Sequence, residues 1–164
     1  MAVHSIKTVQ KIPASLKTVW DFFATPLNLQ TITPGDMSFR IISKNLDSNI
    51  YPGQIIEYKV APLLGIPLYW MTEITEVEEL KFFVDVQKKG PYSLWRHEHY
   101  FMETAEGVEM TDIVHYKNPF GMIGEAANHL FVRNKLKNIF EFRFRKVEEL
   151  LGKCEGQEMK VEIK

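Results

Sequence analysis

The chain has 164 residues, a formal net charge of -1, 45% hydrophobic residues and 25% charged residues. This length and composition are typical of one globular domain with a buried core, and they exclude disordered and fibrous proteins. The near-zero charge gives no electrostatic reason to expect a nucleic acid or an anionic membrane as partner.

The cysteine content and the apolar segments indicate a cytoplasmic protein. Cys154 is the only cysteine, so an intramolecular disulfide is impossible, which favours a reducing compartment. Met1–Lys7 lacks the apolar core of a secretory signal. The longest apolar run, Val60–Met71, is interrupted by proline and glycine and is too short to span a bilayer. We therefore expect a cytoplasmic location and no transmembrane segment.

The first third of the chain predicts one strand and two short helical pieces. Val3–Ile12 alternates weakly and predicts a strand. Ser15 begins a helix that reaches about Thr25, with apolar residues at helical spacing. A second short helical piece starts at Pro26 and ends by Pro34-Gly35.

From Ser38 onward the hydrophobic period changes to two, which predicts a series of strands. Clusters of Gly, Pro, Asn and Asp separate them. The predicted strands are Ser38–Lys44, Gln54–Ala61, Leu68–Val77, Phe82–Lys88, Ser93–Glu103 and Val108–Lys117.

One long helical pattern follows Asn118–Gly121 and reaches about Leu151. Residues 152–164 are polar and should form a frayed tail. Because no repeat or linker is visible, we expect a single domain over residues 1–151. The predicted core stripe of the helix comprises Ile123, Ala127, Leu130, Leu136, Phe140, Val147 and Leu151.

This order of elements predicts an α+β fold. Consecutive strands joined by short loops form an antiparallel sheet, which must bury one face. The C-terminal helix is the only element long and apolar enough to cover that face. A curved, seven-stranded sheet wrapped around it would leave a space in which pockets form.

Two groups of residues carry a resemblance to a known superfamily. Val19–Phe23, followed by Pro26 and Thr33-Pro34, resembles the first helices of the START/SRPBCC superfamily, which has the helix-grip fold and includes polyketide cyclases and lipid-transfer domains. The segment from Phe83 to Gly121 more narrowly resembles a bacterial SRPBCC subgroup of unassigned function. Its matching residues are Phe83-Val84-Asp85, Gly90-Pro91-Tyr92, Trp95, His97, His99, Phe101, Met110-Thr111-Asp112, Tyr116 and Pro119-Phe120-Gly121.

The resemblance implies the fold more strongly than any activity. Members of the subgroup occur alone or fused to sugar-epimerase-like proteins, so the resemblance also implies an epimerase-like protein as a possible partner.

The strand Ser93–Glu103 carries the most informative side chains. Side chains alternate between faces, so Trp95, His97, His99 and Phe101 share one face. Closing the hairpin at Thr104–Gly107 places these four residues opposite Tyr116, Val114, Asp112 and Met110, respectively.

A slip of one residue would instead bring Thr111, Ile113 and His115 to that face. We prefer the first register because it pairs imidazole with carboxylate and apolar with apolar. Asp85 and Gln87 join the same face if the loop through Gly90-Pro91 keeps the alternation. The predicted ligand-binding residues are Asp85, Gln87, Trp95, His97, His99, Phe101, Met110, Asp112, Val114 and Tyr116.

Three apolar loops predict a mouth at one end of the sheet, since alternate turns of a meander share an end. These are Pro62–Pro67, Lys89–Tyr92 and Asn118–Gly124, all rich in Gly and Pro. The first two resemble the gate and latch loops of plant hormone receptors in the superfamily. The alternative is that the loops simply plug this end. The predicted rim residues are Leu63, Leu64, Ile66, Tyr92, Phe120 and Ile123.

The inward polar residues permit three kinds of chemistry. They could satisfy one another by hydrogen bonding and orient a ligand passively. His99 and Asp112 could act as an acid–base pair in a cyclase or dehydratase. His97 and His99 could bind a metal with Asp112 or Asp85 as a possible third ligand. His-x-His spacing alone is a weak signal, so we assign no metal and no cofactor.

We therefore expect a protein that binds a small, mainly hydrophobic molecule, such as a lipid, a polyketide-like compound or an aromatic compound. A cyclase or dehydratase and a protein-interaction module are the alternatives. The oligomeric state stays open.

Overall fold

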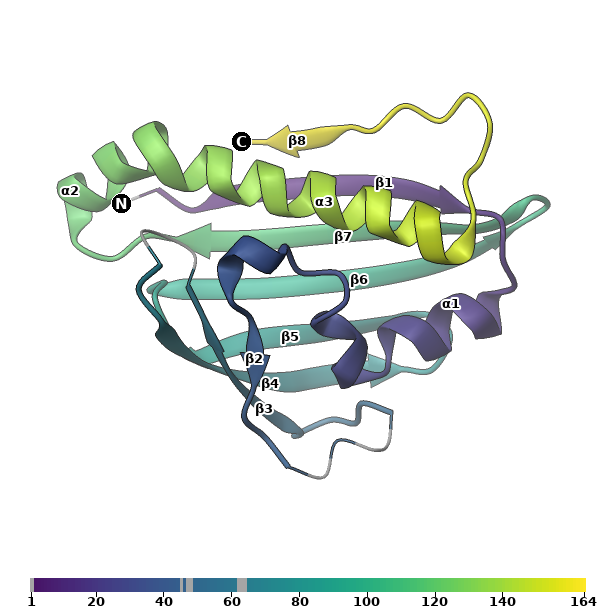
Figure 1. Cartoon of the computed structure of the whole chain (residues 1–164), viewed down its shortest axis with the longest axis horizontal. Helices are drawn as coiled ribbons and strands as arrows, with labels where there is room; N and C mark the ends of the chain where they lie inside the picture. Colours follow the sequence, from purple (N-terminus) through teal and green to yellow (C-terminus); the bar gives the residue numbers. More distant parts are fainter. Residues whose placement is uncertain (1, 45, 47–48, 62–64) are drawn as a thin grey trace.

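The computed structural model describes residues 2–44, 46, 49–61 and 65–164. It contains one curved antiparallel sheet around a long C-terminal helix, which is the predicted architecture (Figure 1). The sheet order is β2-β3-β4-β5-β6-β7-β1-β8, so the predicted meander is confirmed and β1 lies beside its last strand. The strands are β1 (His4–Ile12), β2 (Arg40–Ile41), β3 (Ile55–Val60), β4 (Leu68–Glu78), β5 (Phe82–Lys89), β6 (Leu94–Thr104), β7 (Gly107–Lys117) and β8 (Val161–Ile163).

The sheet has eight strands rather than the predicted seven, because the C-terminal residues fold back onto it. β8 pairs antiparallel with β1, with Ile6 opposite Ile163. The side chain of Gln157 also donates a hydrogen bond to the carbonyl of Lys11 at 3.1 Å. The expectation of a frayed tail is therefore wrong: the tail covers the β1 edge of the sheet.

Three short helical elements lie between β1 and β2. Ser15 caps α1 (Leu16–Phe23) by accepting a hydrogen bond from the amide of Thr18. The 3-10 helices η1 (Pro26–Leu29) and η2 (Gly35–Met37) follow. β2 is shorter than predicted because η2 ends in Ser38, whose left-handed φ of 46° interrupts an extended chain.

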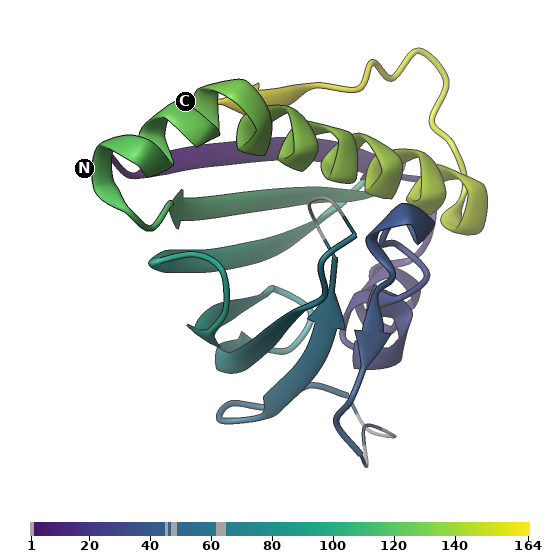
Figure 2. The same cartoon turned by 60° about the vertical axis from the view of Figure 1, so that its left-hand side comes forward.

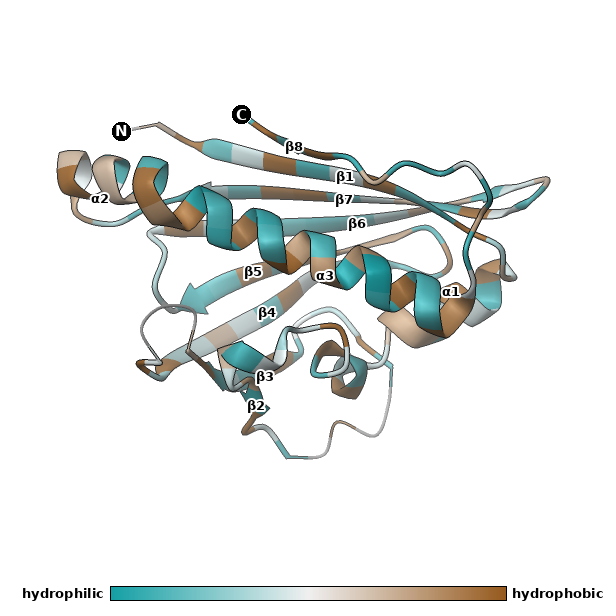
Figure 3. Ribbon diagram, turned by 45° about the horizontal axis from the view of Figure 1, so that its top comes forward, coloured by the Kyte–Doolittle hydropathy of each residue, from teal (hydrophilic) through white to brown (hydrophobic). Residues whose placement is uncertain are grey.

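The C-terminal helix has three segments: α2 (Gly121–Ala127), the π-helical η3 (Asn128–Val132) and α3 (Arg133–Leu151). α3 crosses the concave face of the sheet (Figure 2). Hydrophilic and hydrophobic residues alternate along its ribbon (Figure 3). The buried side chains of α3 are Leu136, Phe140, Phe144 and Val147.

The predicted core stripe is confirmed in α3 but wrong upstream of it. Ile123 is 77% exposed and Leu130 is 65% exposed, whereas Asn128 is buried. A π-helical turn holds an extra residue, which rotates the preceding helix by roughly 100° relative to a regular α-helix. In addition, α2 extends past the ends of most strands (Figure 1), with His4 at the start of β1 contacting Glu125 at 2.9 Å.

The core consists of two apolar clusters along the space between sheet and helix. One surrounds Trp20, Phe83 and Phe101 near α1. The other surrounds Trp70 and Trp95 beneath α3. Within the described residues, no helix combines the length and the hydrophobicity that crossing a membrane requires.

Two leucine-to-alanine substitutions can test which face of the C-terminal helix is buried. Leu136→Ala should lower the free energy of unfolding by about 2–5 kcal/mol, because it removes a buried side chain and leaves a cavity. Leu130→Ala should change it by about 0.5 kcal/mol or less, because that side chain faces solvent. Urea unfolding followed by circular dichroism measures both. Equal losses of unfolding free energy in the two variants would contradict the observed burial of Leu136 and exposure of Leu130.

Candidate functional site

The register of β6 on β7 brings the predicted polar residues together. Residues Trp95, His97, His99 and Phe101 lie opposite Tyr116, Val114, Asp112 and Met110, respectively, so the preferred register is confirmed. β5 lies on the other side of β6, with Asp85 opposite His97 and Phe83 opposite His99. Both imidazoles therefore lie between a carboxylate on β5 and a carboxylate on β7.

These four side chains form what we call the polar cluster: Asp85, His97, His99 and Asp112. Oδ2 of Asp85 lies 3.2 Å from Nε2 of His99 and 3.6 Å from Nδ1 of His97. Oδ1 of Asp112 lies 3.2 Å from Nε2 of His97 and 2.7 Å from Nδ1 of His99. The two imidazole rings are tilted by 38° relative to each other, with centroids 3.8 Å apart. Each ring thus has one nitrogen toward each carboxylate.

Not all of these contacts are hydrogen bonds. The pairs His97–Asp112 and His99–Asp85 have hydrogen-bond geometry. His99 Nδ1, despite its short distance to Asp112, is a buried nitrogen without a hydrogen-bond partner among the described residues. A buried polar atom of this kind is uncommon in folded proteins.

The cluster shifts the pKa values of the two imidazoles in opposite directions. Burial, followed by the nearby His99, lowers the pKa of His97. Burial also acts on His99, but the carboxylates of Asp112 and Asp85 outweigh it and raise its pKa. Burial would raise the pKa of Asp112, but the imidazoles, His99 first, hold it well below its usual range. In the absence of other ligands the cluster therefore favours an ionised Asp112.

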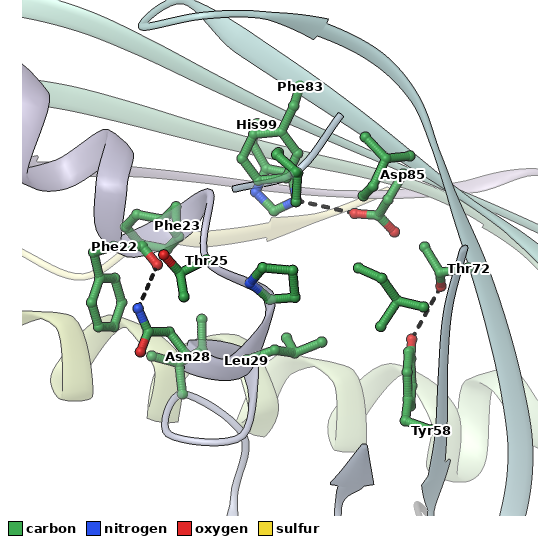
Figure 4. A pocket seen from close by; sticks show the side chains of 15 residues that line it. Phe22, Phe23, Thr25, Asn28, Leu29, Tyr58, Thr72, Phe83, Asp85 and His99 are labelled. Atoms are coloured by element: carbon green, nitrogen blue, oxygen red, sulfur yellow. Dashed lines mark hydrogen bonds and ion pairs between the residues drawn. The ribbon is translucent and has the colours of Figure 1, made fainter. Parts of the chain in front are cut away.

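A cavity of about 80 Å³ opens on the α1 side of the cluster, and we call it the α1-side cavity. His99 and Asp85 lie along one wall, and Thr72 and Tyr58 continue the lining beside Asp85 (Figure 4). The Tyr58 hydroxyl is 3.3 Å from that of Thr72. The rest of the lining is mostly apolar and comes from α1, η1 and the sheet, including Phe22, Phe23, Leu29, Ile56, Ile74 and Phe83.

A second cavity of about 100 Å³, the α3-side cavity, lies on the other side of the cluster. His97 and Asp85 contribute to its lining, so Asp85 borders both cavities. Each void exceeds the roughly 10–15 Å³ that one water molecule needs. The side chains of α3 and the neighbouring strands supply the remaining wall, including Phe39, Trp70, Trp95, Leu136, Phe140 and Arg143.

Two of the three predicted loops, around Pro91-Tyr92 and Asn118–Gly124, border a common cavity, whereas no residue of the first loop lines it among the described residues. A third cavity of about 240 Å³, the mouth cavity, is bordered by Leu68, by Pro91-Tyr92 and by residues 118–120 and 123–124. Phe120 is 81% exposed and Ile66 is 57% exposed. Leu63 and Leu64 lie outside the described residues.

The remaining predicted residues lie elsewhere. Phe101 and Met110 belong to the apolar cluster near α1. Val114 and Tyr116 are 0% exposed, so no water-sized space touches them.

Gln87 instead binds the loop after β5, donating to the carbonyl of Tyr92 at 2.6 Å and accepting from its amide at 3.3 Å. A side chain at Gly90 would collide with Gln87, since a Cβ there would lie 2.4 Å from its Oε1. Gln87 thus holds the loop that carries the mouth residue Tyr92.

The sequence analysis missed several residues that line the cavities. Tyr58 borders both cavities, and Arg143 reaches the α3-side cavity from α3. Trp70 also lines that cavity. Strand alternation could have assigned Tyr58 and Trp70 to the inner face, because they lie directly opposite each other on β3 and β4. Arg143 could not have been distinguished from the other basic residues of the helix.

No protein-family model matches the sequence, and no curated protein matches it. Solved structures do match. Protein CV1439 from Chromobacterium violaceum has 10% identity over 92% of this chain and 99% of its own, with a TM-score of 0.69. Ginseng major latex-like protein 151 from Panax ginseng has 11% identity over 92% of this chain and 99% of its own, with a TM-score of 0.66. Ara h 8.0201 has 14% identity over 90% and 99%, with a TM-score of 0.59.

At these identities the likeness shows the fold alone. The neighbours include latex-like proteins, and the long C-terminal helix over a curved antiparallel sheet is the helix-grip fold that the sequence predicted.

The energetic role of the cluster can be tested at Asp112. Asp112→Asn should lower the free energy of unfolding at pH 7 by about 3–5 kcal/mol, because it removes the charge partner of both buried imidazoles. The depressed pKa of Asp112 stabilises the fold above the unfolded-state value of about 4. The difference between wild type and variant should therefore shrink as the pH falls below that value.

Glu109→Gln is the matched control, because it neutralises a half-buried carboxylate on the other face of β7. It should change the stability by about 0.5 kcal/mol or less. Urea unfolding between pH 3 and pH 7 measures both variants. A loss for Asp112→Asn no larger than that for the control would show that the cluster does not stabilise the fold.

Proposed function

We propose that the protein binds a small, mainly apolar molecule in the space between the sheet and α3. The observation that supports this most strongly is that the three cavities are adjacent and share lining residues. The mouth cavity and the α3-side cavity share Tyr92, Leu136 and Ile139. The α3-side and α1-side cavities share Tyr58 and Asp85. A ligand would thus pass from an apolar rim to a polar interior.

Two buried donors in the α3-side cavity support a ligand with one polar end. Nε1 of Trp70 and Nε of Arg143 are buried and have no hydrogen-bond partner among the described residues. Both residues line the α3-side cavity. An unpaired buried donor costs about 1–3 kcal/mol, and a ligand oxygen would remove that cost. The ligand we propose is therefore an apolar body that carries an acceptor oxygen.

The experiment that tests this function blocks the passage between mouth and interior. Ile139→Trp places a larger side chain where the mouth and α3-side cavities meet. It should weaken saturable binding of a naphthalene-based fluorescent probe at least tenfold, or about 1.4 kcal/mol. Leu150→Trp, an exposed position on the same helix, adds the same ring outside the cavities and should leave the affinity within about twofold.

Fluorescence titration measures both affinities, and thermal melts verify that both variants are folded. Non-saturable binding by the wild type, or equal affinities of the two variants, would contradict binding in this space. Native mass spectrometry of gently purified protein would show a co-purifying ligand directly.

An acid–base enzyme is the second candidate, supported by the contact of His99 with Asp112 at the edge of the α1-side cavity. In a cyclase or dehydratase, His99→Gln would abolish turnover of a polyketide-like substrate and change its binding by less than about tenfold. We expect no turnover by the wild type, because the residues that the structure describes place no separate nucleophile or oxyanion device beside the pair. Turnover that is lost in His99→Gln, with binding retained, would establish the enzyme instead.

An interaction role has a separate basis, the apolar side chains exposed around the mouth. Phe120, Met122 and Ile123 are 81%, 89% and 77% exposed, respectively. A patch of this kind often marks a partner surface. The resemblance to the bacterial SRPBCC subgroup supports an epimerase-like protein as that partner. The single cysteine, Cys154, supports a cytoplasmic setting. Residues 1–151 would form the binding domain, with 152–164 closing its sheet edge.

A further inference from the structure

We propose that Asp85, His97 and His99 bind a divalent first-row transition-metal ion, of which zinc is the reference case. The three side chains come from adjacent strands, and their ligand atoms lie within 4.8 Å of one another. This goes beyond ligand binding and departs from the sequence expectation, which named Asp112 or Asp85 as a possible third ligand but assigned no metal.

The distances around Asp85 fit a metal between the three groups. Zinc binds imidazole nitrogen and carboxylate oxygen at about 2.0–2.2 Å, so tetrahedral ligand atoms lie about 3.3–3.6 Å apart. Oδ2 of Asp85 lies 3.6 Å from Nδ1 of His97 and 3.2 Å from Nε2 of His99. Small side-chain adjustments would therefore complete the three protein ligands.

Asp112 lies where a supporting carboxylate of a metal site belongs. Its Oδ1 contacts the other nitrogen of each ring, Nε2 of His97 at 3.2 Å and Nδ1 of His99 at 2.7 Å. A proton on each of these nitrogens would leave the two nitrogens near Asp85 with free lone pairs. Histidines that bind metals usually donate their second N–H to such an acceptor, which fixes the tautomer.

Without a cation, that tautomer leaves three electron-pair donors facing one another inside the protein. A metal ion between them would remove the repulsion. Nδ1 of His99, 2.7 Å from Oδ1 of Asp112, is not one of the proposed ligand atoms and would keep that contact.

The charge balance also favours a divalent cation. The side chains of Asp85 and Asp112 are 16% and 7% exposed, so two carboxylates lie in a poorly solvated place. Buried charges are costly unless they are compensated. No Lys or Arg forms an ion pair with either carboxylate in the part of the chain that the structure describes, although Arg143 lines the α3-side cavity. A divalent ion would neutralise the pair, whereas one proton compensates only one carboxylate.

The proposed site would be open to a ligand. Asp85 borders both cavities, His99 the α1-side cavity and His97 the α3-side cavity. Three protein ligands with a fourth position facing a cavity are typical of sites in which the metal also binds a substrate oxygen. The ligand class would then be an apolar molecule with an oxygen donor.

The test uses metal-stripped full-length protein, titrated with Co²⁺ and followed by visible absorption, and with Zn²⁺ by calorimetry. We expect one equivalent to bind, with the absorption bands of nitrogen- and oxygen-coordinated cobalt. Asp85→Asn, a nearly isosteric loss of one ligand, should weaken binding at least tenfold. Asp112→Asn keeps all three metal ligands but removes the carboxylate that contacts the second nitrogen of each imidazole. It should weaken binding about 10- to 100-fold.

The matched controls are His115→Gln and His129→Gln, which remove imidazoles outside the cluster and should keep the wild-type affinity. Zinc should raise the melting temperature of the wild type and of both controls, but not that of Asp85→Asn. This measurement also verifies that each variant is folded. Absence of stoichiometric binding by the wild type would overturn the proposal. So would binding that Asp85→Asn retains within twofold, or binding that either control abolishes. Probe binding to the cavities is measured separately and does not depend on these outcomes.

Discussion

The pairing of two buried imidazoles with two carboxylates constrains the whole sheet. Asp85, His97, His99 and Asp112 come from three adjacent strands and can meet only in one register. A slip of one residue would turn the side chains of a strand to the opposite face. It would leave charged or polar partners buried and alone, at a cost of several kcal/mol. The cluster therefore selects the register, and the apolar residues on either side of it follow from strand alternation.

The same cluster divides the interior into two apolar parts. Along β6, Trp95 belongs to the cluster beneath α3 and Phe101 to the cluster near α1, with both histidines between them. One cavity lies on each side of the histidines, and Asp85 borders both. The helix adds a second constraint, because the π-helical segment turns Asn128 inward, where it accepts a hydrogen bond from Tyr116 at 3.0 Å. This leaves the apolar residues of α2 exposed at the mouth.

The sequence predicted the sheet, its meander and the β6–β7 register because these depend on local alternation and short turns. It failed where one element's conformation depends on a distant one. The π-helical turn rotated Ile123 and Leu130 outward, and no pattern in the helix indicated it. The C-terminal strand forms only because β1 offers a free edge. Asp85 was predicted on the condition that the loop at Gly90 keeps the strand alternation, and the β5–β6 register meets that condition. Arg143 was missed because its place depends on the position of α3 on the sheet.

The polar groups of the interior are unequally paired, and this imbalance limits what can occupy it. Asp85 has one hydrogen-bond contact within the cluster, with Nε2 of His99, whereas the buried N–H groups of Trp70 and Arg143 have no acceptor in the described part of the chain. A purely hydrocarbon ligand would leave both donors unpaired in a drier cavity, which would raise their cost. A positively charged ligand would be repelled by Arg143, which lines the α3-side cavity. A ligand oxygen, in contrast, would pair the donors and is also what a metal on Asp85, His97 and His99 would bind. The binding proposal and the metal proposal therefore require the same feature of the ligand, although they rest on different atoms of the protein.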